Sequence, residues 1–338
     1  MKSPSPESLK LVKDFGRPCA LFAVARLPGS GRAFFGGSDF KVCEADVTAA
    51  KFEPKELHGH ASYVTTVALA GNVLVSGGYD GKLVWWDTAK NQAIRTTDAH
   101  ASRVRQAVAT PDGAVVASVG DDMVCKLWDG ATGKPLRELK GHAAKTPAHF
   151  DSMLYAVAFS ADGKLVATGD KVGHVAVWET ESGKPVGTVE APTLYTFDAA
   201  QRMHSIGGIR SLAFSPDGKQ LAVGGMGKVG NIDHLEGKAR VELFDWKAGG
   251  KPTLELQSDK FSGLVNALRF APDGAWLLAA GGAAEGFFLF ADFAAKKLVR
   301  QEKVNMHVHD VALSADAKTL TVAGYNKLAV YALGDAAA

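Results

Sequence analysis

Short apolar runs separated by turn residues recur along the chain. Residues 73–87, 115–135 and 165–185 read VLVSGGYDGKLVWWD, VVASVGDDMVCKLWDGATGKP and LVATGDKVGHVAVWETESGKP, and they align with one another. An apolar stretch and a turn of the PDG type precede such copies, as in AVATPDG from residue 107 and SLAFSPDG from residue 211. This succession of strands and glycine-rich turns predicts an antiparallel sheet of four strands, repeated along the chain.

One residue at the end of the third strand marks each repeat, and the markers lie 41 to 66 residues apart. They are Ala45, Trp86, Trp128, Trp178, Phe244, Phe290 and Tyr331. Isolated sheets of short strands cannot bury both faces, whereas sheets packed around an axis cover each other. We therefore predict an all-β fold, a seven-bladed β-propeller of four-stranded antiparallel blades forming a single domain, 1–338. The expected blades are 15–56, 57–98, 99–140, 141–190, 191–257, 258–302 and 303–335, and a count of six or eight stays open.

The seventh repeat has about three strands before the sequence ends, so another segment must complete its sheet. Residues 8–14, SLKLVKD, alternate in polarity and precede the first inner strand. We expect this N-terminal strand to pair with the outer edge of the last blade and close the propeller, because an unpaired strand edge is a liability.

Composition and charge narrow the class of protein. The 338 residues carry a formal net charge of +2, which gives no general field for a polyphosphate backbone, so nucleic acid is not an expected partner. Cys19, Cys43 and Cys125 have neither the count nor the spacing of a disulfide framework or a zinc site. No apolar run has the length of a membrane span. We expect a cytoplasmic, monomeric propeller that needs no cofactor and that could also serve as a subunit of a larger complex.

The repeat resembles the WD40 (WD-repeat) β-propeller family over essentially the whole chain, and its Gly, Ala and Val usage resembles that of bacterial members. The resemblance implies a buried network of histidine, serine or threonine, aspartate and tryptophan in each blade. The matching residues in two repeats are His60, Ser76, Asp80 and Trp86, then His100, Ser118, Asp122 and Trp128. The fourth repeat keeps His142 or His149, Thr168 and Trp178, but Val172 occupies the expected aspartate position. Later repeats are more degenerate.

Histidine, serine and aspartate together could suggest a catalytic triad. Their repetition within successive sheets and the accompanying tryptophan favour a structural role, because a buried aspartate needs donors. The resemblance implies a rigid platform without built-in chemistry, on which partners dock. We therefore expect a non-catalytic scaffold for a protein or peptide partner.

Three stretches exceed the length of the repeat: 143–152, 191–207 and 225–239. Their positions between strands predict that all three emerge on one face over blades four and five, and long loops in compact folds are often functional. Residues expected to contact a partner there include His149, Phe150, Tyr195, Arg202 and His204; the segments also bring Lys145, Phe197, Met203, Asn231, Asp233 and His234.

The residues that begin each inner strand are expected to surround the channel mouth and to complete the binding face. They are Tyr63, Arg103, Arg105, Tyr155, Arg210, Asn266 and His309. Tyrosine and arginine are the planar anchors that dominate protein interfaces, and arginine favours acidic or phosphorylated peptides.

The sequence leaves three other functions as alternatives. A metal-dependent enzyme could use His142, His149, Asp151, His204, Asp233 and His234, although no local spacing of the HExxH kind brings them together. The GxGxxG within residues 224–232 has no following helix for a dinucleotide. RNA binding has no RNP-like motif to support it.

Overall fold

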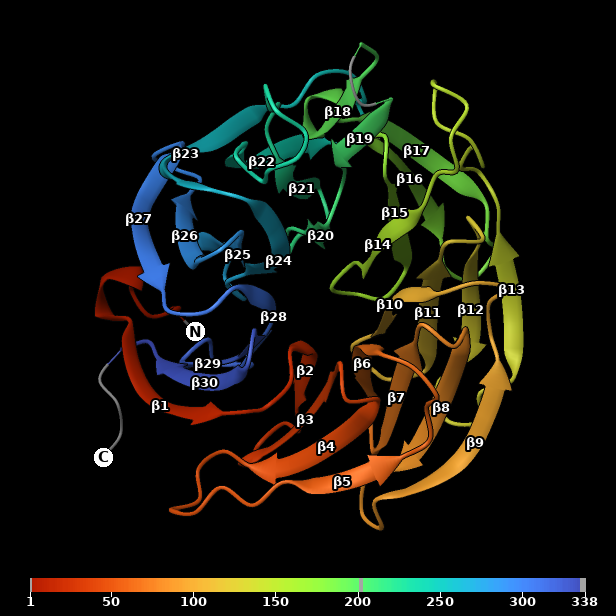
Figure 1. Ribbon diagram of the computed structural model, residues 1–338, viewed down its shortest axis with the longest axis vertical. Helices are drawn as coiled ribbons and strands as arrows, with labels where there is room; N and C mark the ends of the chain where they lie inside the picture. Colours follow the sequence, from red (N-terminus) through yellow and green to blue (C-terminus); the bar gives the residue numbers. More distant parts are fainter. Residues whose placement is uncertain (1, 201–202, 335–338) are drawn as a thin grey trace. The chain divides into compact units, whose positions relative to one another are not determined.

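The computed structural model describes residues 2–200 and 203–334. They form seven four-stranded antiparallel sheets in a β-propeller arrangement, as the repeat predicted, and a separate two-stranded hairpin (Figure 1). The helical content of this part of the chain is two short 3-10 turns, η1 (Pro6–Ser8) and η2 (Pro192–Leu194). None of these helices is long and apolar enough to cross a bilayer. The chain divides into two compact units: the first contains the residues up to Leu139 and those from Val308 onward, and the second contains residues 140–307.

The first unit contains the first, second, third and seventh blades. The first blade consists of β2 (Leu21–Arg26), β3 (Arg32–Gly37), β4 (Lys41–Asp46) and β5 (Lys55–His58). The second consists of β6 (Val64–Ala70), β7 (Val73–Gly78), β8 (Lys82–Asp87) and β9 (Gln92–Asp98). The third consists of β10 (Val104–Ala109), β11 (Val115–Gly120), β12 (Cys125–Asp129) and β13 (Pro135–Leu139). The seventh consists of β28 (Val308–Leu313), β29 (Thr319–Gly324), β30 (Lys327–Ala332) and β1 (Lys10–Gly16).

The second unit contains the fourth, fifth and sixth blades and the hairpin. The fourth blade consists of β14 (Leu154–Phe159), β15 (Leu165–Asp170), β16 (His174–Glu179) and β17 (Pro185–Glu190). The fifth consists of β20 (Ser211–Phe214), β21 (Gln220–Met226), β22 (Lys238–Asp245) and β23 (Leu254–Ser262). The sixth consists of β24 (Leu264–Phe270), β25 (Trp276–Gly282), β26 (Gly286–Asp292) and β27 (Lys297–Val304). The hairpin pairs β18 (Tyr195–Asp198) with β19 (His204–Gly207).

The N-terminal strand completes the seventh blade, as the sequence predicted. β1 pairs antiparallel with β30, and the two lie side by side in Figure 1. The strand begins at Lys10, later than the pattern of residues 8–14 suggested, because Pro6–Ser8 form η1. The Ser8 hydroxyl accepts a hydrogen bond from the Gly334 amide at 2.5 Å, and Lys327 forms a 2.9 Å ion pair with Asp14. The two ends of the described chain are thus joined through one sheet.

The repeat keeps its register in six of the seven blades. In each of these the marker residue pairs with the second residue of the neighbouring strand, and the pairs are Ala45↔Ala33, Trp86↔Leu74, Trp128↔Val116, Trp178↔Val166, Phe244↔Leu221 and Tyr331↔Leu320. In the sixth blade the second residue of β25, Leu277, pairs with Ala291, so the expected marker Phe290, which pairs with Leu278, lies one residue too early. The first six markers are buried, and the core of each unit lies where neighbouring blades pack. Trp85, for example, is fully buried, and its Nε1 donates to the Gly130 carbonyl 3.2 Å away in the next blade. Burying a large aromatic ring together with its N–H partner stabilises the junction.

Candidate functional site

A buried hydrogen-bond network joins four side chains in the second blade. Trp86 Nε1 donates to Ser76 Oγ at 2.8 Å, and Ser76 Oγ lies 2.8 Å from His60 Nε2. Because the Asp80 carboxylate beside Nδ1 can only accept, the neutral imidazole carries its proton on Nδ1, and the Ser76 hydroxyl donates to Nε2. His60 Nδ1 then donates to Asp80, 3.1 Å from Oδ2. The Ala61 amide donates to the same carboxylate oxygen at 2.9 Å, so Asp80 fixes the turn as well as the ring.

The charge of Asp80 is stabilised despite its burial. Burial works to raise the pKa of this carboxyl, but the hydrogen bonds from His60 and the Ala61 amide outweigh it and hold the pKa below its usual value. The third blade repeats the arrangement, with His100 Nε2 at 2.8 Å from Ser118 Oγ, Trp128 Nε1 at 2.9 Å from the same hydroxyl, and His100 Nδ1 at 2.9 Å from Asp122. The side chains of His60 and His100 are fully buried. An imidazole sealed between its partners in this way orders the blade and does not meet a substrate.

The fourth blade has the same network with its aspartate in a different place. His142 Nδ1 lies 3.0 Å from Asp170 Oδ2, and His142 Nε2 lies 2.8 Å from Thr168 Oγ1, which also accepts from Trp178 Nε1 at 3.2 Å. The expectation that Val172 leaves this blade without an aspartate was wrong, because Asp170 supplies the carboxylate from two residues earlier. His142, and not His149, is the histidine of the network.

The glycines of the neighbouring repeats explain this substitution. Gly78 occupies the position in the second blade that Asp170 occupies in the fourth, and a Cβ at Gly78 would lie 3.0 Å from His60 Nδ1 and from Asp80 Oδ1. The first carbon of a side chain at that position therefore already points into the network. Asp170 places its carboxylate in the network from this position. In the second and third blades the carboxylate comes from Asp80 and Asp122, which lie two residues further along the turn.

In the first unit, rings on or beside the inner strands and in the neighbouring turns form a continuous row. Tyr63 packs against Phe22, Phe40 and Tyr79 with ring centroids 5.6 to 5.7 Å apart, and Phe22 packs against His309 at 5.2 Å. Tyr63 and Phe40 are exposed by 40% and 43%. We call Phe22, Phe40, Tyr63, Tyr79 and Arg103 the aromatic row.

The two arginines beside the aromatic row differ in what they can bind. Arg103 is exposed and its guanidinium lies over the Tyr79 ring, 4.9 Å from the centroid, without an ion-pair partner in residues 2–200 and 203–334. Arg105 makes a bidentate pair with Asp121, at 2.6 and 2.8 Å, and donates to the Tyr79 hydroxyl at 2.9 Å. The charge of Arg105 is therefore neutralised within the protein, and of the two only Arg103 is free to meet an acidic ligand.

His309 and the matching residues of the second unit also bond within the protein. His309 Nδ1 donates to the Leu21 carbonyl at 2.7 Å, and burial lowers the pKa of its imidazole, although that hydrogen bond and the nearby Asp310 act to raise it. Arg210 stacks on Tyr155 with its guanidinium carbon 3.9 Å from the ring centroid and donates to the Gly207 carbonyl at 3.1 Å. Asn266 Nδ2 lies 3.1 Å from His307 Nε2.

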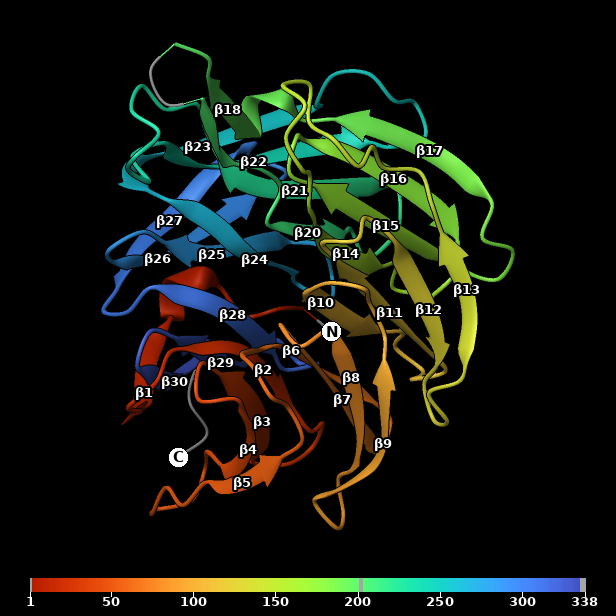
Figure 2. The same cartoon turned by 45° about the vertical axis from the view of Figure 1, so that its right-hand side comes forward.

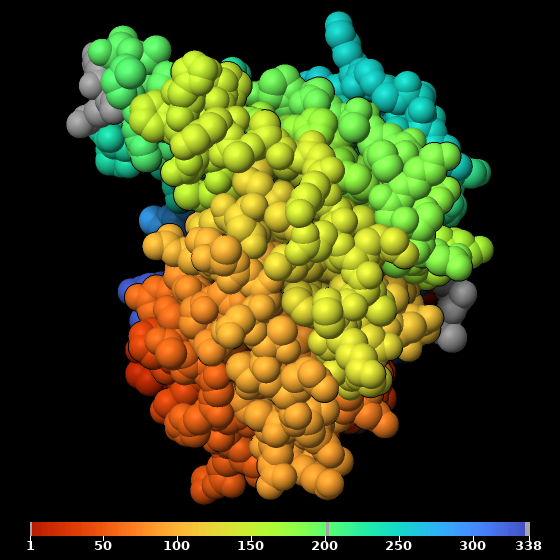
Figure 3. Space-filling model, turned by 90° about the vertical axis from the view of Figure 1, so that its right-hand side faces the viewer, coloured from red at the N-terminus to blue at the C-terminus, as the bar shows by residue number. Residues whose placement is uncertain are grey.

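The three inserted segments of the second unit contact one another. The Phe150 ring in the first segment lies 5.9 Å from the Phe197 ring in the second, and the Thr196 hydroxyl in the second accepts from the Val229 amide in the third at 3.3 Å. Figure 2 shows the β18–β19 hairpin of the second segment, and Figure 3 shows the yellow stretch near residue 150 and the green stretch near residue 200 as adjoining projections. We call residues 143–152, 191–200, 203–207 and 225–239 the inserted-loop surface.

The side chains named from the sequence occupy this surface unevenly. Phe150 and Met203 are exposed by 44% and 57%, and His149 and His204 are exposed as well. Tyr195 is half-buried and begins the hairpin. Arg202 lies outside the described residues. Lys145 and Asp151 form an ion pair at 2.5 Å across the first segment.

Metal binding has no geometric support in the described part of the chain. Residues 2–200 and 203–334 contain no group of three or more histidine, cysteine, aspartate or glutamate side chains placed to hold a metal ion. His142 and Asp170 are used within the fourth blade, and Asp151 is paired with Lys145. The rival set of histidines and aspartates from the sequence is thus not brought together as a site.

Sequence reasoning missed three members of the aromatic row. Phe22 and Tyr79 lie within or directly after strands, and Phe40 is in a turn, where it adopts a φ of 68°. Tyr79 could have been found from the sequence because it directly precedes Asp80 of the network. Both residues lie in the turn after the second strand of the blade, which neighbours the inner strand. Phe40 and Phe22 belong to a repeat without tryptophan, and the sequence has no comparable marker for them.

The fold and these networks define a β-propeller protein whose second, third and fourth blades each contain a hydrogen-bonded histidine, hydroxyl, aspartate and tryptophan. Four segments, 52–87, 91–129, 133–179 and 195–229, match the family model for the WD40 repeat, described as WD domain, G-beta repeat. The chain therefore contains WD40 repeats.

Several known proteins are similar to parts of the chain. Nuclear distribution protein PAC1-2 of Uncinocarpus reesii is 27% identical over 240 residues, which cover 67% of this chain and 45% of that protein. The guanine nucleotide-binding protein subunit beta of Solanum tuberosum is 32% identical over 49% of this chain and 42% of its own length. Apoptotic protease-activating factor 1 of Rattus norvegicus is 30% identical over 45% of this chain and 11% of its own length. The chain thus spans about half or less of these relatives.

Proposed function

We propose that the chain is a non-catalytic scaffold that binds a protein partner through the inserted-loop surface. The observation that carries this proposal is the contact among three segments that are far apart in sequence, made by Phe150 with Phe197 and by Thr196 with Val229. Most residues of these segments lie outside the four-stranded sheets: β18 and β19 pair only with each other, and of the third segment only residues 225–226 and 238–239 belong to strands of the fifth blade. Mutual packing restricts the conformations of these loops before binding, so less conformational entropy is lost when a partner binds.

Exposed apolar side chains support a protein as the ligand. Phe150 and Met203 each present a large apolar side chain to solvent. Burying such a side chain in an interface contributes on the order of 1.5–3 kcal/mol, and a few anchors of this kind carry most of the binding free energy of an interface. The exposed imidazoles of His149 and His204 supply polar contacts beside them.

We also propose the aromatic row of the first unit as a contact surface for a protein partner. Tyr63 and Phe40 are exposed there, and Arg103 adds an unpaired charge over the Tyr79 ring. Tyr155 and Arg210 form a comparable stacked pair in the second unit. Stacked arginine and tyrosine are held ready for a partner because their orientation is fixed before binding.

The experiment is affinity capture from a native lysate with three forms of the full chain. The variant Phe150→Ser/Met203→Ser removes the two exposed anchors, and Ile94→Ser on β9, where the side chain is 54% exposed, is the matched control. We expect one or more proteins to be retained by the wild type and by Ile94→Ser but lost from the double variant. Equal capture by all three forms would overturn the assignment to the inserted-loop surface. Arg103→Glu, as a fourth form, tests the aromatic row separately.

A further inference from the structure

A pocket lies in the first unit, between turns of the first and seventh blades. It has a volume of about 620 Å³, and one wall is the β2–β3 turn, with Leu27, Pro28 and Ser30. The β28–β29 turn, with Leu313 and Ala315, forms the opposite wall. Pro28 and Ala315 are exposed, so the pocket opens to solvent along both turns. Its volume is within the range of ligand sites, which run to about 300–1,000 Å³.

The pocket exists because the turn of the first blade departs from the repeat. In four other blades a serine or threonine hydroxyl donates to the turn aspartate at 2.6 Å, in the pairs Thr110–Asp112, Ser160–Asp162, Ser215–Asp217 and Ser314–Asp316. The hydrogen bonds from Leu27 to Arg32 and from Ser30 to Leu27 show that Leu27 replaces the hydroxyl residue and Gly29 replaces the aspartate. An apolar side chain and a glycine thus stand where the other blades have a bonded polar pair.

The packing of the turns also differs. In the third blade, Gly113 presses on the preceding turn so closely that a Cβ would lie 2.5 Å from the Gly71 nitrogen. In the first blade, Ser30 takes the position of Gly113, because its amide donates to the Leu27 carbonyl as the Gly113 amide donates to the Thr110 carbonyl. The positive φ of this turn is at Gly29, one position earlier, so the two turns differ in conformation.

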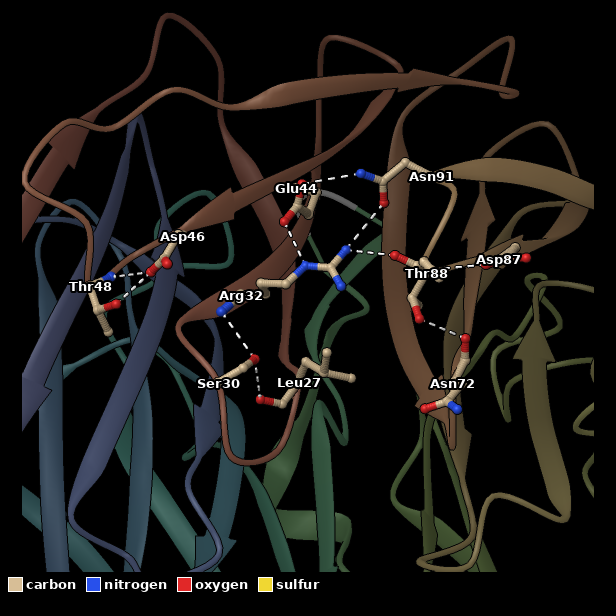
Figure 4. Close-up of polar contacts among 11 residues, drawn as sticks. Leu27, Ser30, Arg32, Glu44, Asp46, Thr48, Asn72, Asp87, Thr88 and Asn91 are labelled. Carbon is tan, nitrogen blue, oxygen red and sulfur yellow. Dashed lines mark hydrogen bonds and ion pairs between the residues drawn. The ribbon is translucent and has the colours of Figure 1, made fainter.

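One cation, Arg26, faces the pocket without a direct ion pair in the described residues, although its charge is among the influences that lower the pKa of Asp46. Arg26 lines it, and its Nε donates to the Ser30 carbonyl at 3.0 Å, which orients the guanidinium. In residues 2–200 and 203–334 the terminal nitrogens of Arg26 have no hydrogen-bond or ion-pair partner. Arg32 is different, because its guanidinium turns toward Glu44, at 2.8 Å, and the Thr88 carbonyl, at 2.6 Å (Figure 4).

The carboxylates near the pocket are already engaged. Asp46 accepts from the amide and the hydroxyl of Thr48, at 2.8 and 2.6 Å, and Asp316 accepts from the Ser314 hydroxyl and the Lys318 amide (Figure 4 shows the first pair). Gly31 is needed for this arrangement, since a Cβ there would lie 2.0 Å from Asp46 Oδ1. These hydrogen bonds fix both carboxylates and lower the pKa of each, so Asp46 and Asp316 stay charged, while the terminal nitrogens of Arg26 bond to neither.

We propose that this pocket binds a linear segment of a partner protein in which an apolar side chain lies next to a carboxylate. The carboxylate pairs with the terminal nitrogens of Arg26, and the apolar side chain contacts Leu27 and Leu313. A guanidinium held by one nitrogen still offers two parallel donors, which match the two oxygens of a carboxylate. A protein segment suits the site because the pocket is open along two surface turns and is not enclosed. The site is separate from the inserted-loop surface and does not depend on the function proposed for it.

The first test uses small probes with the full chain. Amide resonances are followed by NMR while N-acetyl-leucine or N-acetyl-leucinamide, which lacks the carboxylate, is added. We expect N-acetyl-leucine to shift resonances of residues 26–32 and 312–319, and Arg26→Gln to weaken its binding about tenfold to a hundredfold, the range for a hydrogen bond to a charged group. Arg95→Gln, an exposed arginine on β9, is the matched control and should bind as the wild type does. No shift, or equal binding of the two probes, would overturn the proposal.

The second test decides whether the ligand is a protein segment. A display library of random peptides is selected on the wild type and counter-screened on Arg26→Gln and on Ala315→Trp, which fills the pocket from an exposed position. We expect selected peptides to place an apolar residue next to an acidic residue or a C-terminal carboxylate and to lose binding to both variants. Binding of N-acetyl-leucine without any selected peptide, or peptides indifferent to both variants, would contradict a protein segment as the ligand.

Discussion

The Asp170 carboxylate reaches His142 Nδ1 at 3.0 Å from a backbone position where the two preceding blades have glycine. Asp170 is 1% exposed, so its removal leaves the imidazole N–H buried without an acceptor. We expect Asp170→Gly to lower the free energy of unfolding by about 3 kcal/mol, which urea unfolding can measure.

A compensating variant makes this prediction specific to the network. Asp170→Gly/Val172→Asp gives the fourth blade the glycine and aspartate positions of Gly78 and Asp80 in the second. The double variant should recover most of the lost stability, whereas Val172→Asp alone should gain none because Asp170 already fills the site. If the double variant is no more stable than Asp170→Gly, the two positions are not equivalent.

Arg103 and Arg105 are two residues apart but should respond differently to charge reversal. Arg105→Glu replaces the cation of a bidentate pair, whose side chains are 14% and 12% exposed, with a carboxylate facing Asp121. We expect it to cost about 3 kcal/mol of stability, the order found when one partner of a buried pair is removed. Arg103→Glu loses a surface cation–π contact with Tyr79 and should cost less than about 1 kcal/mol.

Thermal unfolding of the two variants, side by side, tests this difference. A similar melting temperature for both would mean that the Asp121 pair contributes little. The result also decides which variant can report on binding, because a partner lost from an unfolded variant says nothing about the aromatic row.

The blades could be predicted from the sequence because their signal is local and repeated. Alternating apolar positions and turn residues define each strand, and the marker residues keep one register in every blade except the sixth, where Phe290 is displaced by one residue. The pairing of β1 with β30 was also predictable, since an incomplete last sheet needs a fourth strand and the alternating N-terminal stretch supplies one.

The details of the sites depend on contacts that a repeat pattern does not contain. Alignment places Val172 opposite Asp80. The carboxylate of the network nevertheless comes from Asp170, because a side chain at that position points toward the histidine. The neutralisation of Arg105 depends on Asp121, 16 positions later in the sequence. The pocket beside Arg26 arises from an absent aspartate in one turn and from the separation of two turns, which only coordinates show.

The N-terminal strand should be required for the stability of the first unit. Deleting residues 2–16 removes β1, the stack of Phe15 on Phe52 at 4.2 Å, and the contacts of Lys13 with the Thr48 and Ala49 carbonyls. It also leaves β30 as an open edge, which invites aggregation. We expect loss of cooperative urea unfolding, while deletion of residues 2–4, which keeps Ser5 as the N-cap of η1 and spares β1, should leave the transition in place. An unchanged transition after the longer deletion would contradict this role.

His309 should make stability depend on pH near neutrality. Burial lowers the pKa of its imidazole below the unfolded value of about 6.5, against the opposing effects of the Leu21 hydrogen bond and Asp310. The unfolded chain therefore takes up the proton first as the pH falls. The stabilisation that comes from keeping His309 neutral is complete above pH of about 6.5 and is lost progressively below it. The urea midpoint should fall between pH 7.5 and pH 5.5 by more in the wild type than in His309→Asn, whose side-chain amide can still donate to the Leu21 carbonyl but does not titrate. The other histidines contribute equally to both proteins, so an identical fall in the two would show that His309 titrates with the same pKa in the folded and unfolded chain.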